Sequence, residues 1–157
     1  MKAKKKKGKF LLQSPKGMHD VLPDEQPYWE KIKKATEKIS ESYGFSRIDT
    51  PAMENAEIFE RTGEETDLIE KQMYYVKTKG KERNLVLRPE GTAPTMRSFL
   101  QHGFSRLGKP LKLYYFGPMF RYEQPQAGRF RQFHQIGFEI FASEDDPIFD
   151  AYAVLAT

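Results

Sequence analysis

The chain has 157 residues, a length typical of one domain and sufficient to bury a hydrophobic core without disulfide or metal support. It contains no cysteine, which excludes disulfides, zinc–thiolate sites and cysteine nucleophiles, and its apolar runs are too short to span a membrane. The net charge is +4, but residues 83–131 alone hold nine basic residues against two acidic ones. Most of the nine are arginines, whose planar guanidinium suits phosphate and carboxylate groups, so we expect an anionic ligand.

The first nine residues are expected to form a disordered basic tail, because their six lysines repel one another and nothing there can be buried. No apolar stretch of signal-peptide type follows, so we expect a cytoplasmic protein. The alternative interpretation of the tail is a nucleic-acid-binding arm. Residues 10–157 are expected to form the folded part of the chain.

The folded part is predicted to begin with a helix over residues 24–43, capped by Asp24 and ended by Gly44. Apolar residues recur in it at spacings of three and four: Tyr28, Ile32, Ala35, Ile39 and Tyr43. A strand over 45–50 should follow. Asn55 is then expected to cap a short helix that reaches residue 61.

The middle of the chain is predicted to contain two strands, over 72–78 and 84–88, joined by a polar turn. A helix over 92–102 should follow, capped by Thr92 and stopped by Gly103. The apolar face of this helix comprises Met96, Phe99 and Leu100.

A hairpin is predicted next. Residues 111–117 should form a strand that Pro118 interrupts, and an extended segment and the loop 124–131 should lead into a long strand over 132–142. Asp146 is expected to cap a last helix that stays apolar almost to its final residue. Because an exposed apolar helix rarely completes a domain, we expect this chain to be part of a longer protein.

The long strand carries polar residues on one face. Alternation places Gln135, Gly137 and Glu139 together, opposite the face of Ile136, Phe138 and Ile140. Glycine in a strand often marks the close approach of a ligand, so this face is predicted to bind a small polar molecule for which Gly137 leaves room. The alternative is the solvent-facing side of an antiparallel sheet.

Arginines flank this strand. If the hairpin forms, Arg121 and Glu123 share a face, Arg121 approaches Gln135 and Glu139, and Arg129 lies at the end of the loop. Phe133 could then stack on a nucleotide base. The sequence has neither a phosphate-binding Gly-x-x-x-x-Gly-Lys loop nor a Gly-x-Gly-x-x-Gly fingerprint, and its three histidines lack metal-ligand spacing. We therefore predict no metal ligands from the protein.

The segment 88–92, Arg-Pro-Glu-Gly-Thr, connects a predicted strand to a predicted helix. Its Glu90 would attract an ammonium group at the helix N-terminus. The alternative is an ordinary connection between the two elements.

Together these segments resemble class II aminoacyl-tRNA synthetases. Residues 43–51 are similar to motif 1 of that class, and residues 120–135 are similar to motif 2. Three segments are similar to histidyl-tRNA synthetase in particular: 16–20, 88–92 and 117–139. Gln124 stands where the family usually has arginine. The family's third motif, its Arg-Gly-Leu-Asp-Tyr-Tyr segment and its anticodon domain have no counterpart in this sequence.

The resemblance implies an incomplete α+β catalytic core, an antiparallel sheet flanked by helices. It implies a histidine–tRNA ligase that uses ATP and Mg²⁺ to form histidyl-adenylate, transfers the histidyl group to tRNA(His), and dimerises through motif 1. The implied catalytic residue is Arg121. The implied histidine-binding residues are Glu90, Gly91, Thr92, Arg121, Gln135 and Glu139. The implied ATP-binding residues are Arg121, Glu123, Arg129 and Phe133.

Two other functions remain open at this point. One is a non-catalytic paralogue similar to the regulatory subunit of ATP phosphoribosyltransferase, whose corresponding segment lacks the Glu90-Gly91-Thr92 pattern. The other is a nucleic-acid-binding fragment driven by the lysine tail. Affinity that falls steeply with salt, and is independent of histidine and ATP, would favour the latter.

Overall fold

The computed structural model describes residues 12–60, 72–80, 84–107, 110–124, 126, 128–142 and 146–156. The predicted basic tail, the end of the short helix at residue 61 and part of the turn before residue 84 lie outside the described residues. Among the described residues, no helix has the length and apolar character needed to cross a membrane.

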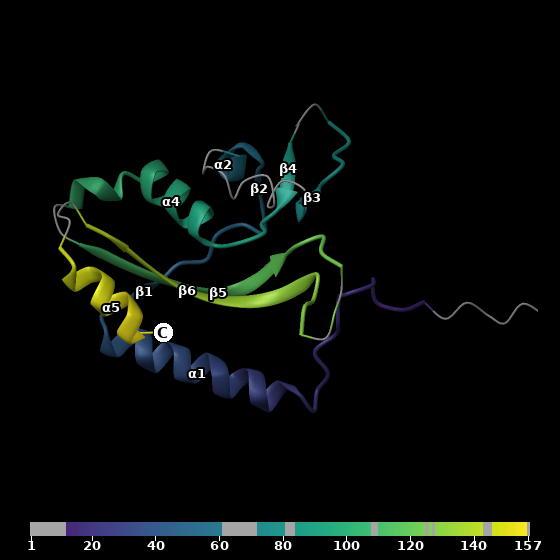
Figure 1. Ribbon diagram of the computed structural model, residues 1–157, viewed down its shortest axis with the longest axis horizontal. Coiled ribbons are helices and arrows are strands. Elements are labelled where there is room, and N and C mark those ends of the chain that lie inside the picture. Colours follow the sequence, from purple (N-terminus) through teal and green to yellow (C-terminus); the bar gives the residue numbers. More distant parts are fainter. Residues whose placement is uncertain are drawn as a thin grey trace, which may run out of the picture.

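A curved three-stranded sheet forms the centre of the fold. Its strand order is β1-β5-β6: β1 (Ser46–Arg47) runs parallel to β5 (Leu111–Phe120), and β5 pairs along its whole length with antiparallel β6 (Gln132–Phe141). Figure 1 shows α1 (Gln26–Ser42) and α5 (Ile148–Ala156) on one side of this sheet, and α4 (Thr92–Gln101) on the other. The predicted α+β class and the predicted hairpin are thereby confirmed.

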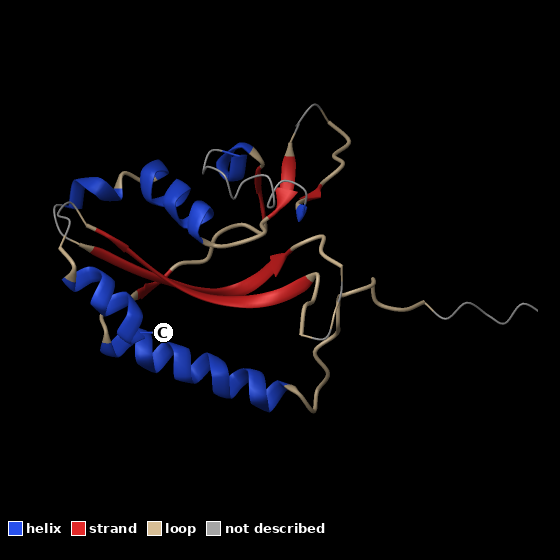
Figure 2. Cartoon of the chain, in the orientation of Figure 1, coloured by secondary structure: helices blue, strands red, loops and turns tan. Residues whose placement is uncertain are grey.

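A second, smaller sheet lies on the α4 side, with strand order β2-β4-β3 (Figure 2). Its strands are β2 (Met53–Asn55), β3 (Tyr74–Tyr75) and β4 (Leu85–Leu87), all antiparallel to their neighbours. The pairing of the two predicted strands is confirmed, whereas β2 was not predicted. Asn55 was expected to cap α2 (Glu57–Glu60), but α2 begins at Glu57, so its N-cap position is Ala56 and Asn55 is the last residue of β2, paired with Leu85; that prediction was wrong.

The fully buried positions of α1 and α4 are small residues, although aromatic residues of both helices, Trp29 and Phe99, also contact rings of the main sheet. In α1 the buried residues are Thr36 and Ser40, whose hydroxyls donate to carbonyl oxygens one turn earlier, while Tyr28 is 71% exposed. Small side chains let a helix approach a sheet closely. In α4 the buried residues are likewise Pro94, Thr95 and Ser98.

Several predicted details of these helices need correction. Met96 and Leu100 are exposed, and only Phe99 of the predicted α4 face packs inward, stacked on Phe141 with ring centroids 4.3 Å apart. The N-cap of α1 is Glu25, not Asp24, and it makes no side-chain capping bond. Gly44, with φ of +72°, does follow the end of α1 as predicted.

Pro118 does not interrupt β5. The N–H of Phe120 donates to the carbonyl of Arg88, so even-numbered residues at this end of β5 direct their backbone groups away from β6. Pro118, two residues earlier, faces the same way, and its missing N–H leaves the ladder with β6 intact.

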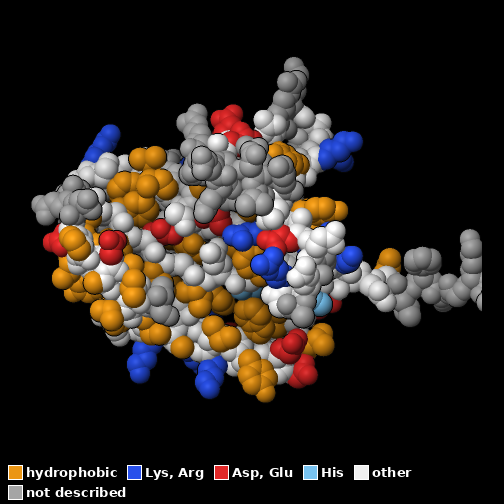
Figure 3. All heavy atoms as spheres, in the orientation of Figure 1, with side chains coloured by type: hydrophobic (Ala, Val, Ile, Leu, Met, Phe, Trp, Pro, Cys, Tyr) orange, Lys and Arg blue, Asp and Glu red, His pale blue; other side chains and the backbone are white. Residues whose placement is uncertain are grey.

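The core divides into two clusters. One lies beneath the small sheet and contains Ala56, Phe59, Met73 and Val86. The other joins α5 to the main sheet through Phe45, Tyr114 and Ala156. Asp146 Oδ1 accepts from the N–H of Ile148, which confirms the predicted cap of α5. Figure 3 shows hydrophobic side chains spread over the region of α5, at the lower left of the view. Val154 of α5 is 73% exposed.

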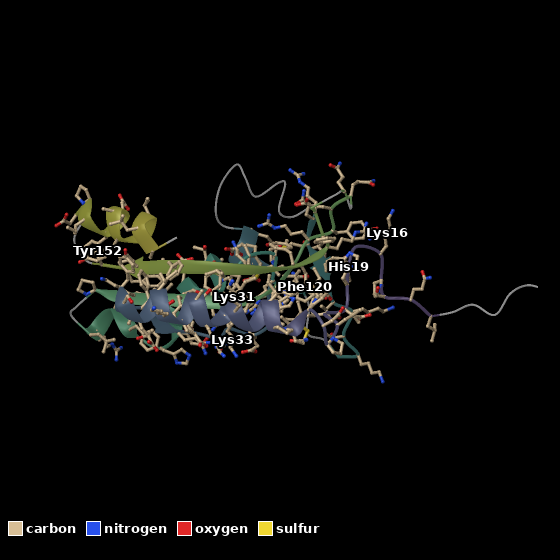
Figure 4. All side chains as sticks on the ribbon, turned by 90° about the horizontal axis from the view of Figure 1, so that it is seen from below. Lys16, His19, Lys31, Lys33, Phe120 and Tyr152 are labelled. Carbon is tan, nitrogen blue, oxygen red and sulfur yellow. The ribbon has the colours of Figure 1, made fainter. Side chains whose placement is uncertain are left out.

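The N-terminal segment is fixed to the end of the hairpin. The carbonyl of Gly17 accepts from the N–H groups of Arg131 and Gln132, and a Cβ on Gly17 would overlap the Arg131 side chain. Lys16 and His19 accordingly lie at the Phe120 end of the sheet, whereas Tyr152 of α5 lies at the opposite end (Figure 4).

Candidate active site

The polar face of β6 is turned toward α4 and is not a solvent-facing side of the sheet. Thr92, the first residue of α4, donates its hydroxyl to Glu139 Oε1 at 2.8 Å. The Oε1 atom of Gln135 is buried and has no hydrogen-bond partner among the described residues. Because an unpaired buried acceptor costs free energy, this atom indicates a place for a hydrogen-bond donor from outside the described residues.

The loop before α4 supplies a second carboxylate. The N-cap of α4 is Gly91, and the carboxylate of the preceding Glu90 accepts hydrogen bonds from the backbone N–H groups of Thr92 and Ala93. The predicted Thr92 cap was wrong because its hydroxyl is used by Glu139 instead. The segment 88–92 thus brings Glu90 and Thr92 to the edge of the polar face of β6.

Tyr115 of β5 is the main feature of this face that was not predicted. It lies opposite Gly137 in the hairpin register and is 5% exposed. A Cβ added to Gly137, or to Gly91 at the start of α4, would overlap its phenol ring. The prediction that Gly137 leaves room for a ligand is therefore wrong, because the Tyr115 ring occupies that space. An aromatic residue opposite a glycine in a hairpin is a recognised pairing, so the register could have indicated it.

The electrostatics of the face follow from burial. Burial raises the pKa of Tyr115 to about 12, so its hydroxyl is protonated at neutral pH. Burial also raises the pKa of Glu139, and the nearby charge of Glu90 acts in the same direction, while hydrogen bonds from Thr92 and Tyr115 lower it. A cationic ligand group placed here would relieve the cost of ionising Glu139.

Arg88 holds the parts of this region together, a role that sequence reasoning missed. Its Nε donates to the carbonyl of Pro118 at 3.0 Å, and its Nη1 donates to the carbonyl and hydroxyl oxygens of Thr50 at 2.7 and 2.9 Å. Burial lowers the pKa of this guanidinium. A Cβ on Gly117 would lie 2.6 Å from its Nη2, so a larger residue at that position of β5 would displace the Arg88 guanidinium.

Arg121 follows β5 and lies on the same sheet face as Gln135 and Glu139. Its Nε donates to the carbonyl of Pro89 at 2.9 Å, and its Cζ lies 5.2 Å from the centroid of the Phe133 ring. The guanidinium is thereby anchored at one nitrogen and stacked on an aromatic face, an arrangement that presents its remaining donors in a fixed direction.

The loop end of the hairpin brings together the two remaining predicted residues. Arg129 Nη1 lies 3.8 Å from Glu123 Oε2, and the Arg129 side chain is 71% exposed. Arg131 Nε donates to the backbone carbonyl of Glu123 at 2.9 Å, and its Cζ lies 4.1 Å from the centroid of the Tyr122 ring. No group of three His, Cys, Asp or Glu side chains in the described part of the chain is arranged to hold a metal ion.

Comparisons with known proteins show the family to which the chain is similar. A family model described as histidyl-tRNA synthetase matches residues 17–147. The histidine–tRNA ligase of Dehalococcoides mccartyi is 48% identical over 136 residues, which is 86% of this chain and 32% of that protein. The ligase of Desulforamulus reducens is 46% identical over 146 residues, which is 92% of this chain and 34% of that protein. The chain therefore spans about a third of the length of these curated relatives.

Solved structures give the same result for the fold. Apo histidyl-tRNA synthetase from S. aureus superposes with a TM-score of 0.75 at 34% identity, covering 93% of this chain and 33% of that one. An ATP phosphoribosyltransferase regulatory subunit/histidyl-tRNA synthetase from Bacillus halodurans has the same TM-score at 24% identity, covering 94% of this chain and 38% of that one, which shows the fold alone. Because the family model covers most of the sequence, the chain belongs to the histidyl-tRNA synthetase family.

Proposed function

We propose that this chain forms part of the catalytic domain of a cytoplasmic histidine–tRNA ligase that dimerises through residues 43–51. The ligase would activate histidine with ATP and then transfer the histidyl group to tRNA(His). The observation that carries the proposal is the polar face of β6, where Glu139 is hydrogen-bonded to Thr92 and the buried Oε1 of Gln135 lacks a partner among the described residues.

Histidine would bind on this face. Its ammonium and imidazole groups are donors, which complements an arrangement dominated by acceptors and carboxylates. The proposed contacts are Glu90, Gly91, Thr92, Arg121, Gln135 and Glu139. Glu90 is already bound to the α4 N-terminus, so its position is fixed before any substrate arrives.

ATP would bind at the hairpin end of the same face. Phe133 would stack on the adenine and Glu123 would contact it, while Arg121 and Arg129 would hold phosphates. The Arg129–Glu123 ion pair would open so that each group meets its own part of ATP. Mg²⁺ commonly keeps substrate phosphates and several waters as its ligands, so it would bind here through the phosphates of ATP. The ion would neutralise charge on the phosphates.

The chemistry needs no protein nucleophile. A carboxylate oxygen of histidine would attack the α-phosphorus of ATP, and the bond to pyrophosphate would break. A terminal ribose hydroxyl of tRNA(His) would then attack the histidyl carbonyl carbon and release AMP. Arg121, fixed by Pro89 and Phe133, would stabilise the charge that develops at the α-phosphate.

Glu139→Gln tests the histidine assignment in a full-length ligase that contains this chain. The substitution keeps an acceptor for Thr92 but removes the charge that attracts histidine. We expect the KM for histidine to rise by about tenfold, since a mismatched buried polar partner costs about 1–3 kcal/mol. The KM for ATP should stay nearly constant. Steady-state pyrophosphate exchange measures both constants.

Thermal stability provides the control for that substitution. Burial raises the pKa of Glu139 in the folded chain. The ionised carboxylate therefore lowers the free energy of unfolding at neutral pH, and this loss disappears only at acidic pH, where the carboxyl group is protonated. Glu139→Gln should therefore leave the Tm unchanged or slightly higher. Equal weakening of histidine and ATP binding would indicate distortion of the hairpin, and no weakening of either would contradict the histidine assignment.

The 157-residue chain alone is expected to be inactive, or nearly so, in histidine-dependent pyrophosphate exchange. It spans about a third of its relatives, and an incomplete site loses the fixed geometry on which electrostatic catalysis depends. Exchange by the isolated chain is compared with that of a full-length ligase containing it. Comparable rates would contradict the expectation that the rest of the protein completes the site.

A further inference from the structure

Tyr115 is the buried titratable group at this site that the proposed mechanism leaves without a role. Its ring lies between two glycines from different elements, Gly91 before α4 and Gly137 in β6. Neither position has space for a side chain, so the ring is in direct contact with both backbones. The Tyr115 ring therefore fills the space between the α4 N-terminus and β6.

The hydroxyl of Tyr115 reaches the same carboxylate as Thr92. Tyr115 Oη lies 3.5 Å from Glu139 Oε1, and Thr92 Oγ1 lies 2.8 Å from that atom. The phenol is protonated at neutral pH, so both hydroxyls act as donors. With one oxygen held from two sides, Glu139 Oε2 is the atom left to accept from a ligand.

We propose that Tyr115 is a positioning residue for histidine: its ring holds α4 at a fixed distance from β6, and its hydroxyl fixes the orientation of Glu139. This inference rests on the proposed function, because it assigns Glu139 to histidine binding. It adds a residue outside the predicted set, one that would act through Glu139 and need not touch the substrate.

Tyr115→Phe separates the two contributions, because it keeps the ring between Gly91 and Gly137 and removes only the donor. Two results are expected in a full-length ligase containing this chain. The pKa of Glu139, followed by carboxyl NMR, should rise, since a bond that favours the charged form is lost. The KM for histidine should rise about three- to tenfold, as for one lost hydrogen bond, with the KM for ATP unchanged.

The pH dependence distinguishes positioning from simple structural support. The groups facing Glu139 are Thr92 and Tyr115 as donors and Glu90 as a second negative charge. Only the Tyr115 donor changes in the variant. The pH below which histidine binding weakens should therefore move upward in Tyr115→Phe, whereas a general loss of stability would lower activity at all pH values alike.

Tyr114→Phe is the matched control. Tyr114 is the preceding residue of β5, is equally buried at 6% exposure, and packs on the opposite sheet face near Phe45 and Phe138. It should alter neither the pKa of Glu139 nor the KM for histidine. If Tyr115→Phe behaves like Tyr114→Phe while Glu139→Gln still weakens histidine binding, the role of Tyr115 is overturned and the proposed function stands. If Glu139→Gln also leaves histidine binding unchanged, both are overturned.

Discussion

Arg121→Ala is expected to lower the rate of histidyl-adenylate formation about 10²–10³-fold in a full-length ligase that contains this chain. The guanidinium would meet charge that is greatest in the transition state, so the loss should appear in kcat as well as in binding. Its anchoring by the Pro89 carbonyl and the Phe133 ring means that the donors are oriented before ATP binds. Single-turnover measurement of adenylate formation would separate this step from product release.

Two further variants make that result specific. Arg121→Lys keeps the positive charge but loses the planar fork, so it should recover only part of the lost rate. Arg106→Ala removes an exposed arginine in the 3-10 helix Phe104–Leu107 and should leave the rate unchanged. A loss smaller than tenfold in Arg121→Ala would indicate an ordinary surface arginine.

The sequence predicted the elements that carry the site better than it predicted how they contact one another. The hairpin, its loop and the alternation of β6 depend on local pattern and turn chemistry, and these were confirmed. By contrast, the residues that α1 and α4 bury are decided by how each helix packs against the rest of the fold, which local pattern does not show. Apolar periodicity identified exposed residues such as Tyr28 and Leu100, whereas the buried positions include small residues such as Thr36 and Ser98. Periodicity alone cannot show that close approach favours small side chains.

The candidate site shows the same difference between residues that a local pattern reveals and residues whose contacts come from distant segments. Its charged residues stand out because carboxylates and arginines are rarely buried without a partner, so Glu139 and Arg121 were identified from the sequence. Tyr115 and Arg88 were missed for different reasons. Tyr115 resembles any aromatic residue of a core strand until the hairpin register places it opposite Gly137. Arg88 binds carbonyl oxygens of Thr50 and Pro118, which are distant in sequence, so no local pattern reveals its partners.

Arg88→Met is expected to cause the largest loss of folding stability among these substitutions, about 3–5 kcal/mol, because it leaves buried acceptors without their donor. The side chain is 7% exposed and links Thr50, after β1, to Pro118 in β5. Methionine keeps much of the volume but none of the donors. Arg88→Lys should recover only part of the loss, since one ammonium cannot reproduce the fork that reaches both carbonyls.

Urea unfolding of the 157-residue chain measures these differences in the free energy of unfolding. The slope of the free energy against urea concentration is fitted separately for each variant. Arg47→Met is the matched control: Arg47 forms exposed ion pairs with Glu37 and Asp49, and such pairs contribute at most about 1 kcal/mol. If Arg88→Met costs no more than Arg47→Met, the buried hydrogen bonds of Arg88 do not hold Thr50 to the hairpin. The carbonyl of Arg88 accepts from the N–H of Phe120, and the carbonyl of Pro89 accepts from Arg121 Nε. If Arg88→Met unfolds the chain while Arg47→Met does not, the backbone that positions Glu90 and Arg121 therefore depends on the Arg88 side chain.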